Sequence, residues 1–155
     1  MFSVIFPGQG SQMVGMGKEF YDKFDLVKNL FKEADDTLNF SMSKLILEGP
    51  KEELDLTANT QPAIFLISYS IYSVIRKEFN IDLSKAKYFA GHSLGEYSAL
   101  SCAGYLNFSE TIKILSIVST FEPNTATIPP SPLGTEFCIA SPLILKIFKV
   151  SEKFK

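Results

Sequence analysis

Residues 88–97 read Tyr-Phe-Ala-Gly-His-Ser-Leu-Gly-Glu-Tyr, and this stretch decides the fold. An apolar run precedes its Gly-x-Ser-x-Gly pattern and a helix-like segment follows it, so we predict a strand, a sharp turn and a helix. Ser93 stands at the tip of the turn. Gly91 and Gly95 are expected there because a Cβ atom at either position would crowd the facing strand or helix. The Ser93 hydroxyl then lies near a helix N-terminus, which stabilises developing negative charge, and it is a candidate nucleophile for acyl transfer.

The composition fits an ordinary globular domain and excludes several function classes. The chain has 155 residues, of which 46% are hydrophobic and 21% charged, enough for one domain with one core. Its net charge of −2 gives no broad basic surface for nucleic acid. No apolar run approaches the roughly 20 residues that span a bilayer, and the first is too short for a signal peptide. Cys102 and Cys138 have no metal or redox spacing, which favours a reducing cytoplasm, and Cys102 is predicted to be a buried packing thiol.

The order of elements predicts an α/β fold with a parallel sheet. Strands are predicted at residues 2–6 and 88–90, and a glycine-containing loop at residues 8–12 follows the first strand. Only two strands are clear, so the sheet and its core are expected to be incomplete. Helices are predicted near Gly17, from an N-cap at Asp25, from Ser41 to Leu47, from Asn59 with Pro62 in the first turn, over 94–103, and from Ser109.

Residues 119–155 differ in character from the rest of the chain. Four prolines lie between residues 121 and 132, and hydrophobic periodicity is lost there. We predict a loop, followed by a short helix that begins at Ser141 and carries Ile147 and Phe148 on one side. The chain thus divides into a domain at 1–118 and an atypical tail at 119–155.

Three motifs together carry a family resemblance. Residues 6–12 read Phe-Pro-Gly-Gln-Gly-Ser-Gln, residues 60–63 read Thr-Gln-Pro-Ala, and residues 91–96 read Gly-His-Ser-Leu-Gly-Glu. At this spacing they resemble the malonyl-CoA:acyl carrier protein transacylases and the acyltransferase domains of polyketide and fatty acid synthases. The resemblance extends from Phe2 to about Ile117. It implies the N-terminal portion of an α/β-hydrolase-like acyltransferase core, into which the family inserts a ferredoxin-like subdomain.

The resemblance also implies a reaction and a set of site residues. Ser93 would take a malonyl group from malonyl-CoA as an ester and pass it to the phosphopantetheine thiol of acyl carrier protein, in fatty acid biosynthesis. The backbone N–H groups of Gln9 and Leu94 would form the oxyanion hole. Gln61 and His92 would line the site in supporting roles. No cofactor or metal is implied beyond the two substrates.

Two groups that the family uses are missing from the positions where the resemblance predicts them. The family's general base is a histidine well after the elbow, but His92 is the only histidine of this sequence. The family's carboxylate-binding arginine follows the helix that ends near Ile117, and Arg76 is the only arginine here. We therefore expect a truncated or frameshifted form, with the ferredoxin-like subdomain and second half missing and weak or no activity. A lineage-specific ending is the alternative.

Two other functions remain open at this stage. A non-catalytic remnant that binds acyl carrier protein would need neither the base nor the arginine. A serine carboxylesterase would share the Gly-x-Ser-x-Gly turn. The N-terminal Gly-Gln-Gly-Ser-Gln loop, in place of a His-Gly-Gly-Gly type of oxyanion loop, argues against the esterase.

Overall fold

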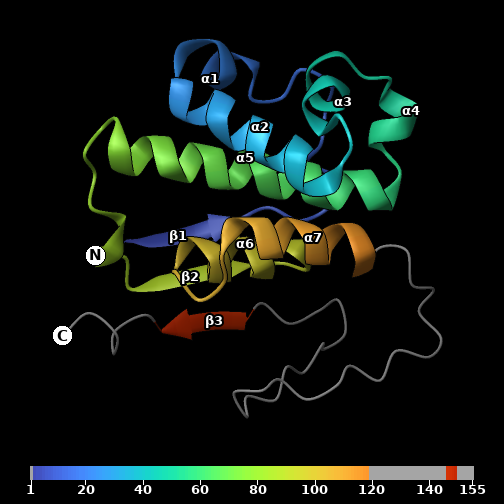
Figure 1. Cartoon of the computed structure of the whole chain (residues 1–155). Coiled ribbons are helices and arrows are strands. Elements are labelled where there is room, and N and C mark those ends of the chain that lie inside the picture. The colour runs from blue at the N-terminus through green and yellow to red at the C-terminus, as the bar shows by residue number, and fades with distance from the viewer. Residues whose placement is uncertain (1, 119–145, 150–155) are drawn as a thin grey trace.

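The computed structural model describes residues 2–118 and 146–149 (Figure 1). In chain order the elements are β1 (Ser3–Phe6), α1 (Lys18–Lys23), α2 (Asp25–Leu38), α3 (Met42–Glu48), α4 (Lys51–Leu54), α5 (Thr57–Lys77), the 3₁₀ turn η1 (Leu83–Lys85), β2 (Tyr88–Gly91), α6 (Leu94–Cys102), α7 (Phe108–Val118) and β3 (Lys146–Lys149).

The first two strands form the parallel pair that the sequence predicts. Ser3 of β1 pairs with Tyr88 of β2, and Phe6 pairs with Gly91. Parallel neighbours need a long crossover, and the helices α1–α5 supply it. The strand order of the described sheet is β1-β2-β3, and β3 runs antiparallel to β2. This confirms the predicted α/β class with a parallel pair.

The tail differs from its prediction where the structure describes it. The predicted helix is wrong at Ile147 and Phe148, because both belong to β3. The free edge of β2 offers a ladder of hydrogen-bond partners at Tyr88–Gly91, and a strand can satisfy its backbone there. The predicted loop and the start of the predicted helix at Ser141 lie outside the described residues.

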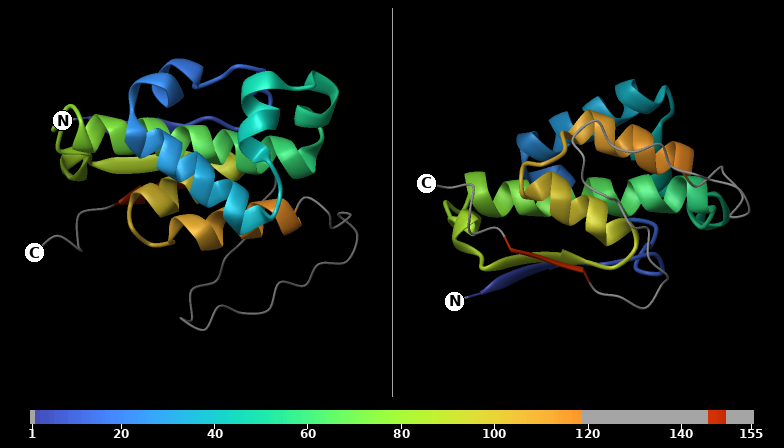
Figure 2. Two further views of the ribbon diagram at one scale, coloured as in Figure 1. Left: turned by 45° about the horizontal axis from the view of Figure 1, so that its top comes forward. Right: turned by 90° about the horizontal axis from the view of Figure 1, so that it is seen from below.

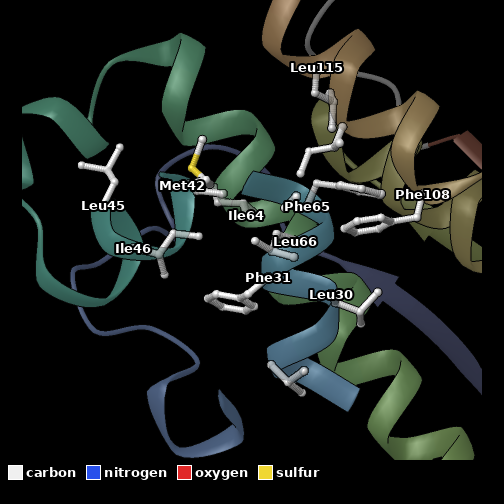
Figure 3. Close-up of a cluster of buried hydrophobic side chains, with 14 of the residues drawn as sticks. Leu30, Phe31, Met42, Leu45, Ile46, Ile64, Phe65, Leu66, Phe108 and Leu115 are labelled. Atoms are coloured by element: carbon white, nitrogen blue, oxygen red, sulfur yellow. The ribbon is translucent and has the colours of Figure 1, made fainter. Parts of the chain in front are cut away.

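The main core surrounds α5, which is apolar nearly all round. Figure 3 shows side chains of α2, α3 and α7 meeting those of α5, and the Phe65 and Phe108 rings stack with centroids 5.5 Å apart. The long helix α5 is therefore central and buried. The fully buried large side chains of this core are Val27, Phe31, Met42, Ile46, Leu54, Phe65, Leu66, Val74, Leu94, Ile112 and Leu115.

A second, smaller cluster fastens the strands to the helices. Three rings meet here: Phe6 of β1 lies 6.4 Å from Phe89 of β2 and 6.4 Å from Tyr72 of α5, between centroids. Aromatic pairs of this kind contribute about 0.5–1.5 kcal/mol beyond their buried area. Cys102 of α6 is buried in the same cluster, and this burial raises the pKa of its thiol. The prediction of a packing thiol is thus confirmed, and both ends of the Ser93 turn are anchored.

The helices that cover the parallel pair lie on one face of it. In Figure 2, α5 and α6 lie on the same side of β1 and β2, and α2 lies beyond α5. The small cluster agrees, because Tyr72 from α5 and Cys102 from α6 share it with Phe6 and Phe89. Across the described residues, no helix is long and apolar enough to cross a membrane.

Three helix starts differ from their predictions by one or two residues. α5 begins at Thr57, and Pro62 therefore lies in its second turn. The reason is that Asn59 and Thr60 donate their side-chain hydrogen bonds back to the carbonyls of α4 rather than capping a new helix. Asp25 is the first residue of α2 rather than its N-cap. For α7, Asn107 accepts the Glu110 N–H at 2.7 Å, and the helix begins one residue before Ser109.

Candidate active site

Ser93 occupies a strained turn between β2 and α6. Its φ of 56° and ψ of −120° lie in a region that residues with a Cβ rarely adopt. Such a conformation costs on the order of 1–3 kcal/mol and persists only where the surroundings enforce it. The Ser93 side chain is exposed. The predicted strand, turn and helix are therefore present, with the hydroxyl at the surface.

The two glycines of the turn allow contacts that no larger residue could make. A Cβ on Gly91 would lie 2.0 Å from the carbonyl carbon and oxygen of Gly95. A Cβ on Gly95 would lie 2.7 Å from the Phe6 carbonyl oxygen and 2.8 Å from that of Pro7. These atoms are all backbone, and side-chain rotation cannot relieve the overlap. The end of β1, the end of β2 and the first turn of α6 thus meet at one point, as the sequence predicts.

The loop after β1 presses against the residue before the serine. A Cβ on Gly8 would lie 3.0 Å from the His92 carbonyl oxygen and 3.1 Å from its Nδ1 atom. Gly8 therefore lies directly beside His92, and Gln9 is the next residue along the loop. The His92 side chain is exposed and lies over this loop. Two regions that are more than eighty positions apart in the sequence form one surface around Ser93.

Hydrogen bonds from the far side of the loop hold it in place. Gln12 accepts the Gly10 N–H at 2.8 Å through Oε1 and donates to Asp55 Oδ1 at 3.0 Å through Nε2. Asp55 also pairs with Lys51. The hydrogen bonds from Lys51 and then Gln12 lower the pKa of the Asp55 carboxyl, so it stays a charged acceptor. We call Gln12 and Asp55 the loop clamp.

Two further side chains of the loop are tied down nearby. Ser11 donates its hydroxyl to the Gly8 carbonyl at 3.0 Å, which tightens the turn itself. Gln9 donates through Nε2 to Thr57 Oγ1 at 3.3 Å, at the first residue of α5. The Gln9 side chain is thereby directed toward α5, and its backbone remains in the loop beside His92.

The start of α6 gives the site its electrostatic character. Leu94 is the first helical residue, and its side chain is only 2% exposed. The next two amides are already used: Gly95 N–H donates to His92 O and Glu96 N–H donates to Ser93 O, both at 2.9 Å. The first N–H groups of a helix carry partial positive charge toward its N-terminus, where Ser93 stands. An oxyanion formed at Ser93 would be stabilised there.

The remaining predicted residues lie on α5. Gln61 is half-buried in its second turn, and its supporting role stays a prediction. Arg76 lies near the opposite end of the helix, where its guanidinium packs over the Tyr72 ring at 5.6 Å. The position of Arg76 agrees with the expectation that it does not serve the site.

Sequence reasoning missed the loop clamp. Gln12 belongs to the motif at residues 6–12, but nothing in the motif indicates its partner. Asp55 follows α4 with no local pattern to mark it, and it lies far from Gln12 in the sequence. Only the fold brings the two together.

Comparisons with known proteins agree with the geometry. The family model described as "Acyl transferase domain" matches residues 3–126, beyond Ile117, where the resemblance was expected to stop. The chain is 50% identical over 111 residues to a malonyl CoA-acyl carrier protein transacylase of Bacillus subtilis, covering 72% of this chain and 27% of that protein. It is 45% identical over 116 residues to the protein of the same name from Haemophilus influenzae, covering 75% of this chain and 36% of that protein.

Solved structures give the same result. The acyl-carrier-protein-S-malonyltransferase of Bartonella henselae superposes with a TM-score of 0.73 at 42% identity, covering 77% of this chain and 38% of that one. A malonyl-transacylase solved in complex with a type II polyketide acyl-carrier protein gives a TM-score of 0.71 at 40% identity. The match covers 76% of this chain and 37% of that chain. The chain thus spans between about a quarter and two fifths of the length of these relatives. It belongs to the acyl transferase domain family.

Proposed function

We propose that this chain supplies the nucleophile of an [acyl-carrier-protein] S-malonyltransferase. The observation that carries the proposal is the exposed Ser93, held at φ 56° on a turn that is enforced by the close backbone contacts at Gly91 and Gly95. Such a turn presents a serine hydroxyl above the end of a sheet, beside a helix N-terminus. We infer the malonyl group and the acyl carrier protein acceptor from the names of the relatives.

The reaction has two halves that share one ester. The Ser93 oxygen attacks the thioester carbon of malonyl-CoA, the carbon–sulfur bond breaks, and coenzyme A leaves as a thiol that carries the proton from the hydroxyl. The phosphopantetheine thiol of acyl carrier protein then attacks the ester carbon, and the proton from that thiol returns to Ser93. The backbone N–H groups of Gln9 and Leu94 would hold the oxyanion of both tetrahedral intermediates, each contributing roughly 3 kcal/mol.

Two residues near the loop after β1, His92 and Gln61, are proposed for supporting roles. His92 lies against the Gly8 loop, and Gln61 lies two turns or fewer from the Thr57 partner of Gln9. We propose that they shape the wall of the site and do not replace the missing general base. We propose a cytoplasmic location, because Cys102 is a free thiol in the described structure and the cytoplasm keeps thiols reduced.

The missing base sets the expected rate. Loss of one member of a catalytic triad lowers the rate by about 10⁴ to 10⁶. With His92 as the sole histidine of the sequence, we expect transfer to acyl carrier protein by this chain alone to be slower than in its relatives by that order. The oxyanion hole alone would still support slow formation of the Ser93 ester.

Intact-protein mass spectrometry after incubation with malonyl-CoA tests the nucleophile. We expect one added malonyl group on the wild type and none on Ser93→Ala. Circular dichroism on the same samples shows that both are folded. A folded wild type that gains no malonyl group would refute the assignment of Ser93, and an adduct that persists in Ser93→Ala would show a different nucleophile.

The absence of the family's histidine and arginine from the sequence favours one second candidate, a non-catalytic remnant that binds acyl carrier protein. Calorimetry separates the two proposals. A remnant binds acyl carrier protein with an affinity unchanged by Ser93→Ala and forms no ester with malonyl-CoA. Hydrolysis of a simple aryl ester without malonyl transfer would instead identify a carboxylesterase.

A further inference from the structure

The loop after β1 holds the peptide groups on both sides of Gln9. In a trans peptide the carbonyl of one residue and the N–H of the next point in opposite directions within one plane. The Gly8 carbonyl therefore sets the direction of the Gln9 N–H, and this carbonyl accepts the Ser11 hydroxyl at 3.0 Å. On the other side of the Gln9 Cα atom, the Gly10 N–H donates to Gln12 Oε1 at 2.8 Å. Both peptide groups that meet at Gln9 are thus hydrogen-bonded.

Asp55, which directly follows α4, connects this loop to the helices. Gln12 Nε2 donates to Asp55 Oδ1 at 3.0 Å, and Lys51 donates to the other carboxylate oxygen. An ionised carboxylate only accepts hydrogen bonds, so it selects the amino end of the Gln12 amide. The carbonyl end of that amide is then left to face Gly10. Asp55 therefore orients the acceptor that holds the Gly10 N–H.

The backbone of Asp55 is anchored to the main core. The preceding residue, Leu54, is fully buried, and its carbonyl accepts the Thr60 hydroxyl at 2.6 Å in a buried hydrogen bond. A second bond runs from Asn59 Nδ2 to the Glu53 carbonyl at 2.8 Å. Both bonds join the end of α4 to α5. The half-buried Asp55 carboxylate thus stands on a support that is fastened to the central helix.

A second hydrogen bond joins the same loop to the same short segment. Gln9 Nε2 donates to Thr57 Oγ1, two residues after Asp55. This bond is 3.3 Å long, exposed, and links two neutral groups. The bond from Gln12 to Asp55 is shorter, partly buried and ends on a charged acceptor, and charge-assisted hydrogen bonds are about twice as strong as neutral ones. Asp55 is therefore the stronger of the two attachment points.

We propose that Asp55 is a positioning residue for the oxyanion hole. Through Gln12 it fixes the peptide group between Gln9 and Gly10, and it thereby limits rotation of the Gln9 N–H out of the oxyanion hole. The inference rests on the proposed function, in which that N–H binds the oxyanion. Such a donor is effective only when it lies about 2.7–3.1 Å from the place that the oxyanion takes. Loss of the Asp55 carboxylate would misplace the donor and leave Ser93 itself unchanged.

The rate of Ser93 ester formation tests the proposal in the full 155-residue chain. Intact-protein mass spectrometry over time, at several malonyl-CoA concentrations, gives the maximal rate constant and the half-saturating concentration. Removal of a whole oxyanion-hole donor lowers the rate by about 10² to 10³. Asp55→Ala leaves the donor present without its anchor, so we expect the maximal rate to fall about 10- to 100-fold. The half-saturating concentration should change less than about threefold, because the lost contact is made in the transition state.

Matched variants assign the effect to the hydrogen bond through Gln12, and urea unfolding shows that each variant is folded in the assay. Asp55→Asn removes the same charge as Asp55→Ala but keeps an accepting oxygen, and its rate should stay within about threefold of the wild type. In a Gln12→Ala background, Asp55→Ala should slow the reaction less than about twofold, because the path is already broken. Asp82 likewise accepts from a serine and pairs with a lysine, but the 21 residues of α5 separate it from Asp55. Asp82→Ala should therefore change the rate less than about twofold.

Hydrogen exchange by NMR supplies a readout that needs no chemistry. The Gly10 amide should exchange about fivefold faster in Asp55→Ala than in the wild type, and an equal rate would overturn the proposal whether or not Ser93 reacts. An ester that forms as fast in Asp55→Ala as in the wild type would overturn it and leave the proposed function intact. The same holds if Asp55→Asn is as slow as Asp55→Ala. A wild type that forms no ester, although Gly10 is protected, would refute the proposed function and the positioning role with it.

Discussion

Gly91→Ala is expected to be among the most damaging single-methyl substitutions in the described part of the chain. The new Cβ would lie 2.0 Å from the Gly95 carbonyl carbon and oxygen. Non-bonded carbon atoms settle at about 3.5–4.0 Å, so β2 and α6 would have to separate by roughly 1.5 Å. Adding a methylene to a packed core costs about 1–3 kcal/mol when side chains can yield. Here only backbone can yield, and we expect a loss of at least about 3 kcal/mol from a total near 5–15 kcal/mol.

Gly104→Ala is the matched control, because it adds the same methyl group without a clash. Gly104 has φ 85° and no neighbouring atom within 4 Å of an added Cβ. Its substitution costs only the left-handed backbone conformation, about 1–2 kcal/mol. Urea unfolding followed by circular dichroism at 222 nm gives both free energies. If Gly91→Ala loses no more free energy of unfolding than Gly104→Ala, the crossing of β2 and α6 does not constrain the turn as we argue.

Three further predictions concern the turn, the core and the loop clamp. Ser93→Gly should raise the free energy of unfolding by about 1 kcal/mol, because glycine relieves the backbone strain at φ 56°. Only part of this gain is lost to the larger conformational entropy of glycine in the unfolded chain. Ser93→Ala keeps the Cβ and should not raise the free energy of unfolding. In the core, the Ser98 hydroxyl is buried without a hydrogen-bond partner in the described structure, so Ser98→Ala should raise the midpoint of thermal unfolding. Thr60→Val should lower the midpoint, because it removes the 2.6 Å hydrogen bond from the Thr60 hydroxyl to the Leu54 carbonyl. Finally, the lowered pKa of Asp55 means that its carboxylate holds the loop at pH values above its unfolded pKa and releases it as pH falls through the lowered value. Amide exchange should show protection of Gly10 that declines over that acidic range, and Asp55→Asn should abolish the decline; the same decline in that variant would contradict the clamp.

The strand, turn and helix around Ser93 could be predicted because the cause is local. Apolar residues at 88–90, glycines at two fixed positions and a following helical segment act within ten residues of one another. The same is true of β1, which the apolar run at residues 2–6 predicts and which ends at Phe6, directly before Pro7. In each case the residue type and its backbone conformation belong to the same short stretch.

The arrangement of the loop could not be predicted because its causes are distant. Gln12 meets Asp55, and Gly8 meets His92, only after the helical crossover brings β1 beside β2. The predicted start of α5 was wrong for a similar reason. The side chains of Asn59 and Thr60 have the chemistry of N-caps, but they bond to carbonyls of the preceding helix, an alternative that residue type alone does not distinguish.

The pairing of β1 with β2 also constrains the order in which the fold forms during synthesis. Ser3 finds its partner Tyr88 only about 85 residues later in the chain. At ribosomal speeds of about 5–20 residues per second, β1 waits roughly 4 to 17 s for its neighbour to be synthesised. During that interval the helices can collapse around α5 through contacts of shorter range, whereas the apolar β1 segment is unpaired and open to other chains. Binding of the nascent β1 segment by a chaperone during this interval would keep it from pairing with other chains.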